Sequence, residues 1–122
     1  MAEDTFADLL KKRRQISITV TGRRTGRAIT IPVWFVCEGN ALWLLPVYGS
    51  QTQWYRNLQA NRAITIQVGS KRHALRARLL KDPRAVRKVI ERFRDKYTPE
   101  QIKRWYTGLD VAVQLPLPIG AT

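Results

Sequence analysis

The strongest constraint on the fold is an alternation of apolar and polar residues that glycine-containing turns interrupt at short intervals. Ile16, Ile18 and Val20 alternate with hydroxyl side chains in residues 15–21, which is the period of a half-buried strand. Turns at 22–27 and 38–40 separate this segment from two further strands, which we expect at 28–37 and 41–45. The N-terminal half is therefore expected to form hairpins.

The remainder of the chain continues this pattern, with helical segments between the strands. Three more strands are expected at 64–68, 73–80 and 111–115, and helices at 4–14, 52–60, 82–97 and 98–107. Six strands without a strand–helix–strand rhythm predict a mainly β fold, an antiparallel six-stranded barrel with peripheral helices. The length suits one domain, residues 1–122, with an N-terminal helix within 1–14 and a frayed tail at 116–122.

Charge and composition limit the classes of partner. The chain carries a formal net charge of +13, which suits nucleic acid, an anionic membrane surface, a small polyanionic ligand, or simply a solvated basic surface. The one cysteine, Cys37, cannot form an internal disulfide and is expected to be a buried, inert thiol. The only histidine, His73, has no metal-ligating neighbours in sequence, so no metal site is expected. Without a long apolar span or a leader pattern, a cytoplasmic protein is expected.

The common catalytic templates are missing from the sequence. His73 begins a strand beside two basic residues, and the few acidic residues lie at helix starts or among arginines. Neither a Walker-type phosphate loop nor a dinucleotide-binding glycine fingerprint is present. If the protein is an enzyme, an organic cofactor is expected to carry the chemistry, and no catalytic residue is assigned.

Two segments are candidates for holding a flat, anionic ligand. Residues 48–58 combine aromatic rings, a glycine and polar groups between two apolar runs. The backbone near Gly49 allows close approach, and Trp54 and Tyr55 offer flat faces. The turn at 22–27 carries Arg23, Arg24 and Arg27, which suit phosphate groups.

These residues also resemble a known family. The pattern Thr21-Gly22-Arg23-Arg24-Thr25-Gly26, then Pro32, then Trp54-Tyr55-Arg56-Asn57-Leu58-Gln59-Ala60-Asn61, is similar to the deazaflavin (coenzyme F-420)-dependent nitroreductases. These belong to the flavin/deazaflavin oxidoreductases, which share the FMN-binding split β-barrel of the pyridoxamine-phosphate-oxidase-like proteins. The resemblance covers residues 15–68 well and continues loosely to Leu117.

The resemblance implies a set of cofactor-binding residues. Arg23, Arg24 and Thr25 would lie near the phosphate of coenzyme F-420, and the strand through Thr30 to Pro32 would border its ring. The remaining implied contacts come from the loop of Pro46, Val47, Tyr48, Gly49 and Ser50, and from Gln53, Trp54 and Asn57. The loop lacks a serine and a lysine that the family often has there, and Ser50 and Arg27 are expected to replace them in part.

The implied activity is hydride transfer from reduced coenzyme F-420 to a small electron-poor acceptor such as a quinone or a nitroaromatic. Tyr48, Tyr55 or water would supply the proton. Two alternatives remain: an FMN-binding oxidoreductase on the same barrel, and a non-enzymatic basic barrel that binds nucleic acid. Nucleic acid is not the expected partner, because Trp34, Trp43 and Trp54 lie among apolar or turn residues. A monomer and a homodimer are both compatible with the sequence.

Overall fold

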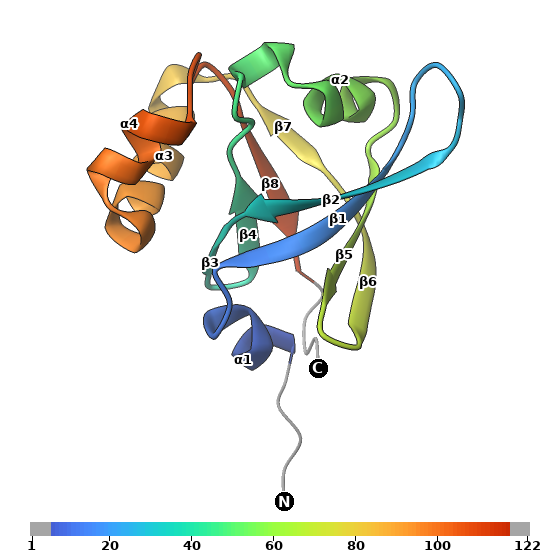
Figure 1. Ribbon diagram of the computed structural model, residues 1–122, viewed down its shortest axis with the longest axis horizontal. Coiled ribbons are helices and arrows are strands. Elements are labelled where there is room, and N and C mark those ends of the chain that lie inside the picture. The colour runs from blue at the N-terminus through green and yellow to red at the C-terminus, as the bar shows by residue number, and fades with distance from the viewer. Residues whose placement is uncertain (1–5, 118–122) are drawn as a thin grey trace, which may run out of the picture.

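The computed structural model describes residues 6–117, which form two four-stranded antiparallel sheets with helices around them (Figure 1). The first sheet has the order β2-β1-β5-β6, and the second has the order β3-β4-β8-β7. The strands of the first sheet are β1 Gln15–Thr21, β2 Ala28–Trp34, β5 Ala63–Val68 and β6 Lys71–Arg76. Those of the second are β3 Val36–Glu38, β4 Ala41–Leu44, β7 Arg78–Leu80 and β8 Ala112–Pro116.

The expected number of six strands was wrong: the described residues contain eight. Two of the predicted strands each bend at one residue and continue in the other sheet. The first bend is at Phe35, between β2 and β3, and the second is at Ala77, between β6 and β7. Apolar alternation runs through both residues, so the periodicity alone did not reveal the bends.

The backbone at each bend leaves the regular ladder and needs other partners. The amide of Ala77 donates to the carbonyl of Arg62 at 2.8 Å. At the other bend, the hydroxyl of Tyr97 accepts from the Phe35 amide at 3.1 Å and lies 2.8 Å from the Phe35 carbonyl oxygen. A side chain from a distant helix therefore satisfies the bend at Phe35.

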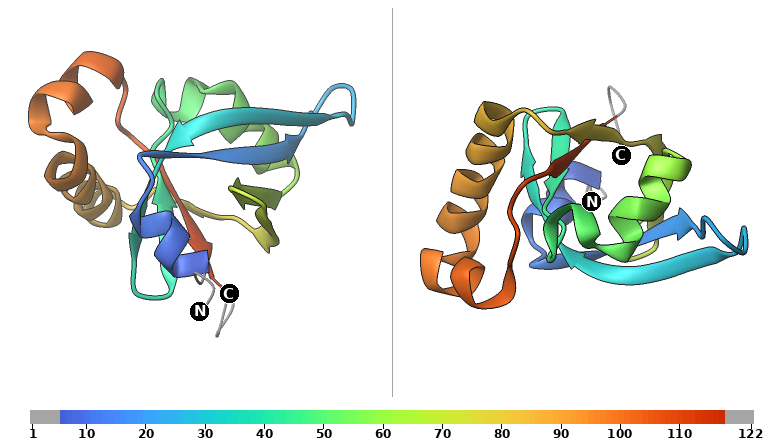
Figure 2. Two further views of the ribbon diagram at one scale, coloured as in Figure 1. Left: turned by 60° about the horizontal axis from the view of Figure 1, so that its bottom comes forward. Right: turned by 90° about the horizontal axis from the view of Figure 1, so that it is seen from above.

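The helices lie outside the sheets (Figure 2). They are α1 Phe6–Lys11, α2 Gln53–Ala60, α3 Pro83–Tyr97 and α4 Pro99–Trp105, and a short 3-10 helix, η1 Gly49–Gln51, precedes α2. The predicted start of α3 is confirmed, because the Asp82 carboxylate accepts from the Ala85 amide at 3.0 Å. Thr52 lies at the start of α2 as expected, but its hydroxyl accepts from the Tyr48 amide at 2.8 Å and makes no capping bond to the helix.

Two apolar clusters hold the elements together. The larger contains the inward-facing residues of both sheets with α1 and α2, for example Ile18, Ile66 and Leu58. The second lies between the β3–β4 region and the helices α3 and α4, and includes Val89, Phe93 and Tyr97. Helices α3 and α4 are therefore bound to the sheets through a core of their own.

The ends of the chain differ in part from the expectation. Pro116 belongs to β8, where it pairs with Ala41, and the Leu117 amide donates to the Asn40 carbonyl at 2.7 Å. The predicted frayed tail was therefore wrong at residues 116 and 117, and its remainder lies outside the described residues, as does the predicted helix start at residue 4. In the part of the chain that the structure describes, no helix is long and apolar enough to cross a membrane.

Candidate functional site

Two cavities lie next to each other along α2 and β2. The first, which we call the basic cavity, has a volume of about 300 Å³ and lies between the turn at 22–27 and α2. It is lined by Gly22, Arg23, Arg24, Thr25, Ile29, Gln53 and Asn57. Two guanidinium groups and a hydroxyl in one cavity are a donor set that suits an anion such as a phosphate.

Arg23 joins the turn to α2. Its Nη1 and its backbone amide both donate to Asn57 Oδ1, at 2.7 and 3.2 Å, and its Nη2 donates to Gln53 Oε1 at 2.8 Å. Asn57 is buried, so these bonds satisfy an amide oxygen that has little access to water. Arg24 and Thr25 are exposed, and the guanidinium of Arg24 makes no hydrogen bond or ion pair within residues 6–117.

The second cavity, the aromatic cavity, has a volume of about 410 Å³ and lies between β2, the start of α2 and the end of α4. Three tryptophans and a tyrosine give it flat apolar walls, which suit a planar ring system. It is lined by Gln15, Ile31, Pro32, Val33, Trp34, Leu45, Val47, Trp54, Trp105 and Tyr106.

Trp34, which forms part of the cavity wall, packs against the ring of Tyr97. Trp34 stacks on Tyr97 with ring centroids 4.4 Å apart and an angle of 8° between the planes. The guanidinium carbon of Arg14 lies 5.2 Å from the Tyr97 ring centroid. Burial raises the pKa of Tyr97 to about 12 and also raises the pKa of Tyr106, so both hydroxyls keep their protons at neutral pH.

The two cavities share their supporting elements. Gln53 lines the basic cavity and Trp54 lines the aromatic cavity, although they are consecutive residues of α2. On β2, Ile29 lines the basic cavity and Ile31 the aromatic cavity. One elongated ligand with an anionic end and a flat end would therefore contact both.

The structure brings together eight of the residues assigned from the sequence. In the basic cavity these are Arg23, Arg24, Thr25, Gln53 and Asn57, and in the aromatic cavity they are Pro32, Val47 and Trp54.

Six other assigned residues line neither cavity: Arg27, Thr30, Pro46, Tyr48, Gly49 and Ser50. The Thr30 hydroxyl lies 2.7 Å from that of Thr19 on the neighbouring strand. The Tyr48 side chain is 65% exposed.

The expected backbone donors of the 46–50 loop already have partners. The Gly49 amide donates to the Pro46 carbonyl at 3.0 Å, and the Ser50 amide donates to Asp110 Oδ1 at 2.9 Å. The carboxylate of Asp110 therefore occupies the Ser50 amide that was expected to bind the cofactor.

The main residues that were not assigned to the site from the sequence are Trp34, Trp105 and Tyr106. Trp34 lies two residues after Pro32 on the same strand and therefore on the same face, a signal that the sequence did contain. Trp105 and Tyr106 are far away in sequence, and only the packing of α4 brings them to the cavity.

Of the expected proton donors, Tyr55 is fully buried in the larger core cluster, and neither Tyr48 nor Tyr55 lines the basic or the aromatic cavity. Tyr106 is the only side chain with a hydroxyl group that lines the aromatic cavity.

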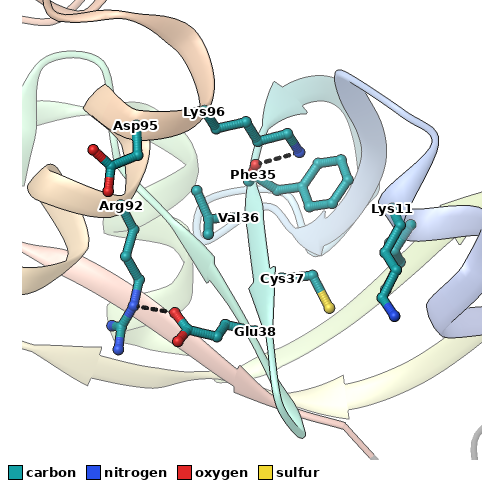
Figure 3. A pocket seen from close by; sticks show the side chains of 9 residues that line it. Lys11, Phe35, Val36, Cys37, Glu38, Arg92, Asp95 and Lys96 are labelled. Carbon is teal, nitrogen blue, oxygen red and sulfur yellow. Dashed lines mark hydrogen bonds and ion pairs between the residues drawn. The ribbon is translucent and has the colours of Figure 1, made fainter.

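A further cavity of about 470 Å³ lies beside β3, between α1 and α3 (Figure 3). Its lining includes Cys37, which is half-buried, so the expectation of a buried thiol was wrong. Burial raises the pKa of Cys37. Figure 3 also shows the ion pair of Arg92 with Glu38 (2.6 Å) and the hydrogen bond from Lys96 to the Phe35 carbonyl (2.9 Å). None of the assigned cofactor residues lines this cavity.

Comparison with known proteins identifies the family. Residues 2–116 match the family model described as "F420H(2)-dependent quinone reductase". The chain belongs to the F-420H2-dependent quinone reductase family. It is therefore an oxidoreductase that depends on coenzyme F-420. No similar sequence was found among curated proteins.

Solved structures support the fold assignment. A structure described as an F-420H2-dependent reductase has 21% sequence identity and a TM-score of 0.67, over 84% of this chain and 94% of the other. One described as a domain-swapped dimer has 21% identity and a TM-score of 0.68, over 84% and 80%. One described as an F-420 reductase has 20% identity and a TM-score of 0.61, over 95% and 94%. At these identities the likeness shows a shared split-barrel fold.

The residues present fit the cofactor of this family. Coenzyme F-420 combines a planar deazaflavin ring with a phosphate and an oligoglutamate tail. The aromatic cavity has walls for the ring, and the adjacent basic cavity has the cationic donors that a phosphate requires. The chain's surplus of basic residues also suits an anionic tail.

Proposed function

We propose that this member of the quinone reductase family reduces a small planar quinone or a related electron-poor acceptor in the aromatic cavity. Support comes from one observation above all: a cationic cavity and an aromatic cavity adjoin along α2 and β2, and consecutive residues, Gln53 and Trp54, line them. When bound, reduced coenzyme F-420 supplies a hydride. The protein supplies position and a dry environment.

The roles of the individual residues follow from their surroundings. We assign Arg24 and Thr25 to direct contact with the cofactor phosphate, and Arg23 to holding the turn on α2. Trp34 and Trp54 would pack against flat rings and exclude water. The Tyr106 hydroxyl, whose pKa is raised by burial, is proposed to orient the acceptor or to donate the proton that completes quinone reduction.

Other assigned residues, Arg27, Thr30, Pro46, Tyr48, Gly49 and Ser50, remain predictions from the resemblance. The single-domain organisation, a cytoplasmic location and a monomeric or homodimeric state also remain predictions. FMN is the second candidate cofactor, because it too combines a flat ring with a phosphate. The nucleic-acid alternative has less support, because Trp54 is buried and Trp43 is covered by Arg92, whose guanidinium lies 4.4 Å from the ring centroid.

The decisive experiment is a side-by-side titration of the purified protein with coenzyme F-420 and FMN, followed by turnover with menadione. We expect tighter binding of F-420 and oxidation of its reduced form that depends on menadione. Preferential binding of FMN, or no reaction with menadione and with a nitroaromatic acceptor, would contradict the proposal. Salt-dependent binding of single-stranded DNA without any flavin affinity would favour the nucleic-acid alternative.

A further inference from the structure

Residues 107–110, which we call the strap, connect α4 to β8 and lie against the turn of residues 46–51 (Figure 1). The Thr107 amide donates to the Val47 carbonyl at 2.7 Å. The Asp110 carboxylate accepts from Ser50 through both oxygens, with Oδ1 at 2.9 Å from the Ser50 amide and Oδ2 at 2.7 Å from the Ser50 hydroxyl. Three hydrogen bonds therefore join segments that are about 60 residues apart in sequence.

The two backbones are in direct contact between these bonds. A Cβ atom at Gly49 would lie 1.7 Å from the Gly108 carbonyl oxygen and 2.1 Å from Asp110 Oδ1. Gly49 and Gly108 also have positive φ angles of 58° and 63°, which side-chain-bearing residues rarely adopt. Both the space and the backbone conformation thus favour glycine at this contact.

The carboxylate form of Asp110 is the one that the contact favours. Burial by itself would raise the pKa of Asp110, but the hydrogen bonds from the Ser50 hydroxyl and amide outweigh burial and lower it. At neutral pH the strap is therefore bound to the turn through the charged Asp110 carboxylate.

The contact joins two walls of the aromatic cavity. The turn carries Val47, and the strap follows directly after Trp105 and Tyr106. At the C-terminal end of α4, Trp105 is 57% exposed and Tyr106 is buried against Phe93. The strap bonds are the contacts that connect this end of α4 to the turn. The basic cavity includes no residue of the strap or of the turn.

We propose that Asp110 is a positioning residue for the electron acceptor, because it ties the end of α4 to the turn and so sets the width of the aromatic cavity. The inference rests on the proposed function, in which the acceptor occupies that cavity. If Asp110 has this role, its substitution should change the fit of the acceptor without changing the affinity for the cofactor. A general loss of stability would change both properties together.

The test compares Asp110→Ala and Asp110→Asn with the wild type, with Glu91→Ala on the exposed face of α3 as the control for charge removal. Steady-state kinetics with menadione should show KM raised about fivefold in Asp110→Ala. The kcat value and the dissociation constant for F-420 should stay close to the wild-type values. Asp110→Asn keeps an acceptor for the Ser50 amide, so it should show a smaller increase in KM.

Hydrogen exchange of the protein without cofactor provides a readout that does not depend on activity. Amides of residues 105–110 should exchange faster in Asp110→Ala, while those of β1 and β5 should be unchanged. Unchanged exchange in the strap together with an unchanged KM would overturn the inference, and so would a parallel loss of cofactor affinity in both Asp110 variants. If the wild type reduces neither menadione nor a nitroaromatic acceptor, the proposed function fails, and the exchange experiment still decides whether Asp110 holds the end of α4.

Discussion

At the scale of single residues, Arg23 and Arg24 show how neighbours of the same type differ in role. The sequence assigned both to a phosphate, because both lie on a glycine-bounded turn. In the folded protein Arg23 points to α2 and bonds Asn57 and Gln53, whereas Arg24 is exposed at the basic cavity. The sequence could predict the residue type, but it contained no information on which guanidinium has protein partners.

Because of this difference, substitution of Arg24 and substitution of Arg23 should affect the melting temperature differently. Arg24→Ala should weaken F-420 binding by about tenfold or more, because a charge-assisted bond to phosphate is lost, and should leave the melting temperature nearly unchanged. Arg23→Ala should lower the melting temperature as well, since the buried Asn57 oxygen loses its Nη1 donor and keeps only the backbone amide of residue 23. Fluorescence titration and thermal unfolding measure the two effects.

Arg87→Ala is a matched control, because Arg87 is an exposed arginine of α3 outside both cavities. It should change neither property. Equal F-420 affinity for Arg24→Ala and the wild type would remove Arg24 from the site.

At the scale of elements, the bend at Phe35 connects the two sheets and sets the position of Trp34. The Tyr97 hydroxyl lies at this bend and is also 2.6 Å from the Arg14 carbonyl oxygen, at the start of β1. One hydroxyl at the end of α3 therefore fixes the path of two strands. The alternating pattern predicted most strand positions correctly, but the bend at Phe35 depends on a partner that is 62 residues away.

Tyr97→Phe should lower the free energy of unfolding by about 1–3 kcal/mol, because the Phe35 amide at the bend loses its acceptor. Urea unfolding measures this change. Tyr55→Phe is the natural control: the Tyr55 hydroxyl is buried and has no hydrogen-bond partner within residues 6–117, so its removal should be neutral or stabilising. Equal losses in the two variants would show that the bend does not depend on the Tyr97 hydroxyl.

At the scale of the whole molecule, the 22 lysines and arginines outnumber the 9 acidic residues. Lys96 is half-buried, donates to the Phe35 carbonyl and lies 3.6 Å from the centroid of the Phe35 ring. Burial lowers the pKa of Lys96 to about 8 from 10.5, with a smaller contribution from the positive charge of Arg14. Between these two values the unfolded chain binds more protons at this residue than the folded protein does.

The stability of the protein should therefore rise with pH just above pH 8, to the extent that Lys96 controls it. Lys96→Met should lack this rise, whereas Lys88→Met, on the exposed face of α3, should retain it. The measurement is urea unfolding of the three proteins at a series of pH values. The difference between wild type and Lys96→Met isolates the lysine, because Cys37 and the buried tyrosines titrate in both. Parallel pH profiles for these two proteins would contradict the pKa shift.

The sequence alone determined the features that depend on local order along the chain. These are most of the alternating strands, the start of α3, and the family motif from Thr21 to Asn61 with its F-420 cofactor. Only the tertiary structure decided where two strands bend, which arginine is free for a ligand, and that Asp110 occupies the donors of Ser50. The physical reason is that local pattern depends on backbone geometry and solvent exposure, whereas the choice of partner depends on which distant groups the packed core brings within hydrogen-bonding distance.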